Sequence, residues 1–187
     1  NTYSASGGTL NGGSTSIALA DGTNGGLASN YTINDGVFTI TKKTISVSGA
    51  RLYDATTDAV ASDLTTISGL VGSETLTLSG SGTLSDANVA DNKTVSLNTL
   101  SIADNTGLAA NYTLSGGTHQ LTVNQRPLNA TLSRQYDGTT TSAGSDLSSF
   151  DALQGGETLT LSGSGTSANA NVANGIAMSS NGNLALV

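Results

Sequence analysis

The stretch ETLTLSGSGT, residues Glu74–Thr83, occurs a second time as Glu157–Thr166, 83 positions further along the chain. Threonine and leucine alternate in its first half, and serine and glycine alternate in its second half. Alternation with a period of two places leucine on one face of a β-strand and threonine on the other. The stretch therefore predicts a strand in which Leu76 and Leu78 face a core, followed by a turn over Ser-Gly-Ser-Gly.

The repeat extends beyond these ten residues. The same spacing of 83 relates Tyr53-Asp54 to Tyr136-Asp137, and a spacing of 81 relates the segment 26–33 to 107–114. Such matches predict tandem units of about 82 residues. We expect residues 1–43, the N-terminal segment, to be the C-terminal part of a repeat unit. Residues 44–125, the middle unit, are then complete, and residues 126–187, the C-terminal segment, are the N-terminal part of the next unit.

Short alternating runs separated by turn residues predict an all-β fold. Strands are expected near 44–49, 74–79, 94–98 and 119–124, and no stretch carries a convincing helical stripe. Eight apolar residues of these strands should face inward: Ile45, Val47, Leu76, Leu78, Val95, Leu97, Leu121 and Val123. We expect tandem small β-sandwich units. The alternative is a β-solenoid, which would show a shorter period of about 20–30 residues.

The composition excludes some classes of partner. Only six residues are Lys or Arg and the net charge is −7, so no basic face could follow a nucleic-acid backbone or an anionic membrane. The sequence contains no stretch of 18 apolar residues, so no membrane-spanning helix is expected. The chain starts at Asn1 without Met, which favours a fragment or a processed piece. The absence of Cys together with the richness in Ser, Thr, Asn and Gly favours an extracellular protein.

Several motifs, in a fixed order, resemble a known family. They are Leu52–Thr57 and its copy Gln135–Thr140, Asp86–Val89 followed by Lys93–Val95, and Ala110–Leu114. Together they resemble the YDG domain, a β-rich repeat found in tandem in large bacterial surface and secreted adhesins, including filamentous-haemagglutinin-like exoproteins. The resemblance implies a location at the bacterial cell surface or outside the cell, and a role in cell adhesion and biofilms. One departure is Ala55, where the motif usually has Gly.

The motif residues admit a functional and a structural interpretation. Asp54, Asp58 and Asp137 could offer oxygen ligands to a metal or a sugar, but no clustered acidic loop accompanies them, as calcium would require. We favour a structural role, in which the aspartates cap turns while Tyr53 and Tyr136 fill the core. Asn111 and Tyr112 are expected to form a turn that leads into the last strand pair.

Catalytic chemistry is not expected. His119 is the only histidine, and its place before a strand-like run predicts an exposed side chain rather than a member of a catalytic triad. The glycine-rich stretches lack the lysine and the strand–loop–helix context of a phosphate loop. We therefore expect no enzyme activity, no cofactor and no metal.

Two functions remain after these exclusions. The first is a structural stalk module of a large bacterial cell-surface adhesin or extracellular fibre. The alternative is a module that binds a host or matrix glycan, which the absence of Trp disfavours. The expected partners are neighbouring repeat units or identical chains joined head to tail, since two incomplete units would expose complementary sheet edges.

Overall fold

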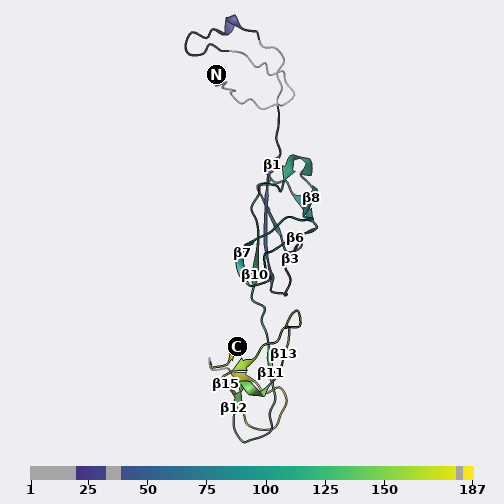
Figure 1. Cartoon of the computed structure of the whole chain (residues 1–187), viewed down its shortest axis with the longest axis vertical. Coiled ribbons are helices and arrows are strands. Elements are labelled where there is room, and N and C mark those ends of the chain that lie inside the picture. The colour runs from purple at the N-terminus through teal and green to yellow at the C-terminus, as the bar shows by residue number, and fades with distance from the viewer. Residues whose placement is uncertain (1–19, 33–38, 180–182) are drawn as a thin grey trace. The chain divides into compact units, whose positions relative to one another are not determined.

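A computed structural model describes residues 20–32, 39–179 and 183–187 (Figure 1). The chain divides into two parts, residues 1–40 and 41–187, and each is described by itself. Over the described residues the chain forms β-strands and three short 3-10 turns, without any α-helix, so the all-β prediction is confirmed. None of the helical turns in these ranges has the length and apolar character needed to cross a membrane.

The described residues of the first part include one 3-10 turn, η1 (Ala28–Asn30). The backbone N–H of Ala28 donates to Oδ1 of Asp21 at 2.7 Å, which fixes the approach to this turn. Polar and apolar residues alternate in Phe38-Thr39-Ile40, which would suit a strand, but Phe38 lies outside the described residues. Thr39 and Ile40 are described and lie in no strand.

Ten strands and one 3-10 turn lie between Lys43 and Asn124. They are β1 (Lys43–Thr44), β2 (Ser46–Leu52), β3 (Asp58–Val60), β4 (Thr66–Ser68), β5 (Leu76–Ser79), β6 (Ser81–Thr83), β7 (Ala90–Thr94), β8 (Ser101–Asp104), η2 (Ala109–Asn111), β9 (Tyr112–Thr113) and β10 (His119–Asn124). Most strands are short, as expected for a sequence with turn residues every few positions.

The largest sheet has four strands in the order β4-β2-β10-β7. Its two central strands, the first and the last long strands of the middle unit, run parallel in a register from Val47 opposite His119 to Leu52 opposite Asn124. The short strands β1 and β9 continue this parallel pairing at the N-terminal end. The outer strands β4 and β7 are antiparallel to their neighbours.

The remaining strands form two antiparallel pairs, β3 with β6 and β5 with β8. Their apolar side chains and those of the four-stranded sheet form a single buried cluster, to which β2, β3, β5 and β10 all contribute. The sheets are small and compatible with a β-sandwich. The parallel neighbours β2 and β10 are separated by most of the unit, whereas a solenoid would pair strands one short coil apart.

The parallel pairing determines where the chain enters and leaves the middle unit. Strands β2 and β10 point the same way, so the chain enters at the start of β2 and leaves at the end of β10, at the opposite end of the unit. Figure 1 shows the chain arriving beside β1 and departing beyond β10. An antiparallel pairing of the same two strands would have brought both connections to one end.

The repeated ten residues form a strand that changes its partner. Leu76 and Leu78 lie in β5, which pairs with β8, and the chain then continues into β6, which pairs with β3. The expected reversal of the chain at Ser-Gly-Ser-Gly is therefore wrong. Gly80 takes a φ of +84° at the change of partner, and a Cβ atom on Gly82 would lie 2.4 Å from the Ser96 carbonyl oxygen. Both glycines are needed, one for its conformation and one for close packing.

The strand expected at 94–98 is mostly absent. Strand β7 ends at Thr94, and the next residues bond to two different elements. The N–H of Val95 donates to the carbonyl of His119 in β10, while Ser96 exchanges two hydrogen bonds with Thr83 in β6. The chain here passes from one layer to the other, so no continuous ladder forms. The side chains still alternate, with Val95 buried and Leu97 packed against the core.

The other predicted core positions are confirmed. Ile45, Val47, Leu76, Leu121 and Val123 are buried, and Leu78 is half-buried against the same cluster. His119 is buried too, at 6% exposure, so the expectation that it is exposed is wrong. His119 lies on the same inward face of β10 as Leu121 and Val123. Its ring lies between two backbone groups: the Leu114 carbonyl is 2.8 Å from Nε2, and the Val47 N–H donates to Nδ1 at 3.3 Å.

The C-terminal segment repeats much of this topology. Its elements are β11 (Ala130–Leu132), β12 (Thr141–Ala143), η3 (Gly144–Asp146), β13 (Leu147–Phe150), β14 (Leu161–Ser162), β15 (Ser164–Ser167), β16 (Met178–Ser179) and β17 (Ala185–Leu186). Strands β12 and β15 pair in the register of β3 and β6 shifted by 83 positions. Strand β11 pairs with β13 as β2 pairs with β4. The boundaries at 43/44 and 125/126 stay predictions.

The two faces of the repeated strand can be tested by substitution. Replacing the buried Leu76 by Ala should lower the free energy of unfolding by about 2–4 kcal/mol, because the shorter side chain leaves a cavity in the small core. Replacing the exposed Thr77 by Ser should change it by less than about 0.5 kcal/mol. Chemical denaturation of both variants measures the difference, and equal losses would mean that the strand faces are assigned wrongly.

Candidate functional site

The Tyr-Asp motif forms a tight turn held by an arginine. Oδ1 of Asp54 accepts hydrogen bonds from the backbone N–H of Thr56, at 3.0 Å, and from its hydroxyl group, at 2.9 Å. Arg51 pairs with the second carboxylate oxygen of Asp54 and donates to the carbonyl of Thr56 at 2.7 Å. Asp54 thus caps the turn, and the guanidinium group ties both sides of the turn to the end of β2.

The second copy of the motif has the same geometry. Oδ1 of Asp137 accepts from the N–H and the hydroxyl of Thr139, both at 2.9 Å. Arg134 pairs with Asp137 and donates to the carbonyl of Thr139 at 2.5 Å. Each arginine thus occupies the same place in its own turn, and all four polar contacts recur.

Burial, hydrogen bonds and the arginine charges shift the pKa of the carboxyl groups in and beside the turns. Burial opposes ionisation of Asp54, but the hydrogen bonds from Thr56 and the charge of Arg51 outweigh it and lower its pKa. The backbone and hydroxyl hydrogen bonds from Thr139, followed by Arg134, lower the pKa of Asp137. Asp63 lies 4.0 Å from Nε of Arg51, yet burial dominates there and raises its pKa.

The residue after each aspartate takes a left-handed conformation. Ala55 has φ of +61°, and Gly138 at the same place in the second copy has φ of +76°. A positive φ is unfavourable for alanine and costs glycine nothing sterically. The departure from the motif at Ala55 therefore places a strained residue at this turn.

Tyr53 connects the middle unit to the C-terminal segment. Its N–H donates to the Asn124 carbonyl at 2.9 Å, and its carbonyl accepts from Nε of Arg126 at 2.6 Å. Its hydroxyl group donates to Oε1 of Glu157, the first residue of the repeated stretch in its second copy. This bond to a carboxylate, followed by burial, raises the pKa of Tyr53. Tyr136 is 66% exposed, so the expectation that it fills a core is wrong.

Tyr112 has a corresponding bond inside the middle unit. Its ring is buried in the core, and its hydroxyl group donates to Oε2 of Glu74 and accepts from the N–H of Val71 at 3.1 Å. The bond to Glu74 raises the pKa of Tyr112. Asn111 ends η2 directly before this tyrosine, so the 3-10 turn leads into the short strand β9.

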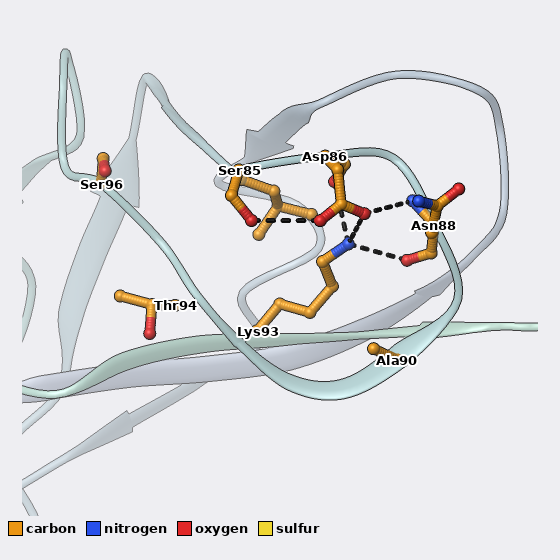
Figure 2. A pocket seen from close by; sticks show the side chains of 8 residues that line it. Ser85, Asp86, Asn88, Ala90, Lys93, Thr94 and Ser96 are labelled. Carbon is orange, nitrogen blue, oxygen red and sulfur yellow. Dashed lines mark hydrogen bonds and ion pairs between the residues drawn. The ribbon is translucent and has the colours of Figure 1, made fainter.

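An open pocket of about 560 Å³ lies beside the loop between β6 and β7 (Figure 2). Its only cationic lining residue, Lys93, donates to Oδ1 of Asp86 at 2.5 Å and to the carbonyls of Asp86 and Asn88. The bond from Lys93 is also the main cause of the lowered pKa of Asp86. In the second copy Asn169 and Ile176 stand in place of Asp86 and Lys93. The Lys93–Asp86 ion pair therefore holds the loop between β6 and β7 in the middle unit, and the second copy has no such pair.

Within the described ranges, no group of three or more His, Cys, Asp or Glu side chains could hold a metal ion. The ring nitrogens of His119 are both engaged by the backbone. In each Tyr-Asp turn the aspartate carboxylate is bound by a threonine and an arginine, whereas Nε of Arg51 is buried without a hydrogen-bond partner.

The predicted motif residues lie in three places. Tyr53 and Asp54 lie in one turn, Tyr136 and Asp137 lie in the second turn, and Tyr112 belongs to the same core cluster as Leu76. The sequence analysis missed the roles of Arg51 and Arg134, and of Glu74 and Glu157. A signal was present in the sequence, because charged residues are only 10% of the chain and these four form two matched pairs, each separated by 83 positions.

Residues 37–121 match the family model of the YDG domain. This segment is a YDG domain. No curated protein and no solved structure matches the chain significantly. The YDG domain thus contains β1 to β9 and the first half of β10. It includes the Tyr-Asp turn held by Arg51 and the loop between β6 and β7 held by Lys93, called the Lys93 loop below.

The strained alanine of the YDG domain gives a testable prediction. Ala55→Gly should raise the free energy of unfolding by about 0.5–1 kcal/mol, because glycine removes the steric cost of a positive φ and adds only a smaller entropic cost. Ala50→Gly, the same change at an exposed position inside β2, should lower it. Chemical denaturation decides, and destabilisation by both changes would contradict the strain at Ala55.

The lowered pKa of Asp54 predicts an acid-sensitive contribution to stability. Its folded pKa lies below the unfolded value of about 3.9, so the stabilisation is complete above that value and is lost as the pH falls through the folded pKa. The difference in unfolding free energy between the wild type and Asp54→Asn should therefore be larger at about pH 6 than at about pH 2.

Asp63 provides the control for this pH dependence. Its pKa is raised, so ionisation of Asp63 destabilises the fold, and the difference between the wild type and Asp63→Asn should change with pH in the opposite direction. Urea denaturation across this pH range measures both differences. The same pH trend for both variants would contradict the assigned interactions.

Proposed function

We propose that the chain is a structural repeat module, a stalk segment, of a large bacterial cell-surface adhesin or extracellular fibre. The observation that supports this most is the parallel pairing of β2 with β10. It sends the chain in at one end of the middle unit and out at the other. Units of this kind, joined in tandem, add their length to a fibre, which is what a stalk needs.

The same pairing suits a module that carries tension. A force applied through the two connections pulls the start of β2 against the end of β10, along the strands. The hydrogen bonds across six paired positions are then loaded together. An antiparallel pair pulled from one end would instead open one hydrogen bond at a time. The geometry therefore favours resistance to a force along the fibre.

The contacts of Tyr53 support a defined connection between successive units. Arg126 and Glu157, both in the C-terminal segment, bond to its backbone carbonyl and its hydroxyl group respectively. Tyr53 belongs to a motif that recurs in the next copy as Tyr136. A tyrosine at the same place in each unit would supply a contact to the unit that follows.

An extracellular location and a non-enzymatic role are part of this proposal. The chain has no cysteine, few cleavage points for trypsin-like proteases and a net negative charge, all of which suit an exposed, soluble stalk. In the described residues the charged side chains of both motif turns and of the Lys93 loop are bound to one another. These contacts favour a structural role over binding of a glycan, which stays an alternative prediction.

Force spectroscopy with two pulling geometries tests the stalk function. The chain lacks Cys, so handles can be attached through Thr44→Cys with Gln125→Cys, which loads β2 and β10 in shear. The matched control uses Thr44→Cys with Ser68→Cys, which opens the antiparallel β2–β4 pair from one end. We expect a clearly higher unfolding force in the first geometry. Equal forces would contradict a load-bearing role for the β2–β10 pair.

A further inference from the structure

The Tyr-Asp turn of the middle unit contacts the C-terminal segment through two residues. Tyr53 bonds through its carbonyl to Arg126 and through its hydroxyl group to Glu157. Ala55, two residues further along, lies beside Gly155. A Cβ atom on this glycine would lie 2.9 Å from Cβ of Ala55, which is closer than a real Cβ atom comes to such a neighbour. The turn therefore meets the C-terminal segment both at its first residue and at 155–157.

The surface that receives the Tyr-Asp turn is itself a tight turn. The N–H of Glu157 donates to the carbonyl of Gln154 at 3.0 Å, and the two residues between them, Gly155 and Gly156, have φ of +61° and +76°. A Cβ atom on Gly156 would meet no atom within 4 Å, unlike one on Gly155. The two glycines thus share a left-handed conformation but differ in their surroundings.

The Tyr-Asp turn keeps its shape through bonds of its own. Thr56 and Arg51 bind the carboxylate of Asp54. Tyr53 and Ala55 therefore flank a fixed residue, and groups that are held in advance lose little conformational entropy when they make a contact. Ala55 keeps its positive φ despite the steric cost, and strain of this kind concentrates at functional contacts.

The linker between β10 and β11, residues 125–129, is restrained as well. Arg126 precedes Pro127, the only proline of the chain. Proline fixes its own φ and favours an extended backbone at the residue before it. The N–H of Tyr53 donates to the carbonyl of Asn124 at 2.9 Å, so the end of β10 is tied to the same turn. These restraints limit the directions in which the linker can leave the middle unit.

We propose that the Tyr-Asp turn is the joint that fixes one unit to the next, and that its partner is the turn 154–157 of the following unit. Ala55 and Gly155 form a size-matched pair in this joint, since a methyl group on one side requires a bare glycine on the other. Tyr53 anchors the joint by a charge-assisted bond to Glu157.

This joint rests on the tandem arrangement of the proposed function and names the two surfaces that connect the units. The joint and the load-bearing pair can nevertheless fail separately. The pulling experiment loads β2 and β10 inside the middle unit, whereas the joint lies outside that pair, between the middle unit and the C-terminal segment.

Distances between two spin labels measure how firmly the joint is held in the full chain. The chain has no cysteine, so labels can be attached through Thr77→Cys in β5 and Ser149→Cys in β13, two exposed positions, one on each side of the joint. A held joint gives one narrow distribution of label-to-label distances. We expect this narrow distribution, and a broad one would overturn the proposal.

Two alanine substitutions in the receiving turn separate steric contact from backbone strain. Gly155→Ala places a methyl group against Ala55 and should broaden the distribution. Gly156→Ala also puts alanine at a positive φ in the same turn, but its Cβ atom meets open space, so the distribution should stay narrow. Broadening by both variants, or by neither, would overturn the size-matched pair.

A double variant shows whether the two residues act on each other. Ala55→Gly combined with Gly155→Ala moves the methyl group from one side of the joint to the other and should restore the narrow distribution. A need for glycine at 155 that came only from its own turn would not be relieved by a change in the Tyr-Asp turn. A distribution as broad as that of Gly155→Ala alone would therefore overturn the pair.

Removal of one hydroxyl group tests the anchor. Tyr53→Phe keeps the ring and loses the bond to Glu157, so we expect a broader distribution. The matched control is Tyr136→Phe, which removes the hydroxyl group of an exposed tyrosine in the second turn and should change nothing. An unchanged distribution in Tyr53→Phe, or equal broadening in both variants, would overturn the assignment of Tyr53 as the anchor.

Discussion

The parallel pairing of β2 with β10 is the constraint on which the middle unit depends. It joins the first and last long strands, so every strand between them must form a crossover that returns the chain to the start of the sheet. The pairs β3–β6 and β5–β8 lie on this crossover and complete the core. Because β10 joins the β4–β2 pair to β7, the four-stranded sheet is complete only when this last strand is present.

Polar contacts supplement a small apolar core. The chain has only two Phe and no Trp, and its few charged residues are concentrated in contacts that hold loops. Arg51 fixes the turn after β2, and Lys93 fixes the loop before β7. Glu74 holds the hydroxyl group of the one tyrosine in the core cluster. Each of these contacts connects segments that apolar packing alone would leave loosely defined.

Much of the fold could be predicted from the sequence because alternation is a local signal. It identified β5 and β10, and it placed Leu76, Leu121 and Val123 on the buried face. It failed at 94–98, where the chain bonds to two layers in turn, and at Gly80, where the strand changes partner instead of reversing. Those features depend on contacts between strands distant in sequence, which local patterns do not contain.

The candidate site was predictable to a smaller extent. The turn around Asp54 follows from residue types. The alanine that replaces the usual glycine of the motif, Ala55, is the residue of this turn with a positive φ. The bonds from Tyr53 to Glu157 and from Tyr112 to Glu74 join residues far apart in the chain, and only the recurrence of the glutamate hinted at them. His119 was misjudged because a histidine that bonds only to backbone groups has no sequence signature.

The central claim is that β2 and β10 form the stable centre of the unit, and amide hydrogen exchange tests it most directly. The amides that hydrogen-bond across this pair should exchange only through global unfolding, with the highest protection in the chain. The β5–β8 and β3–β6 pairs should open more easily and exchange faster. Protection in β10 no greater than in these pairs would contradict the claim that the parallel pair holds the unit together.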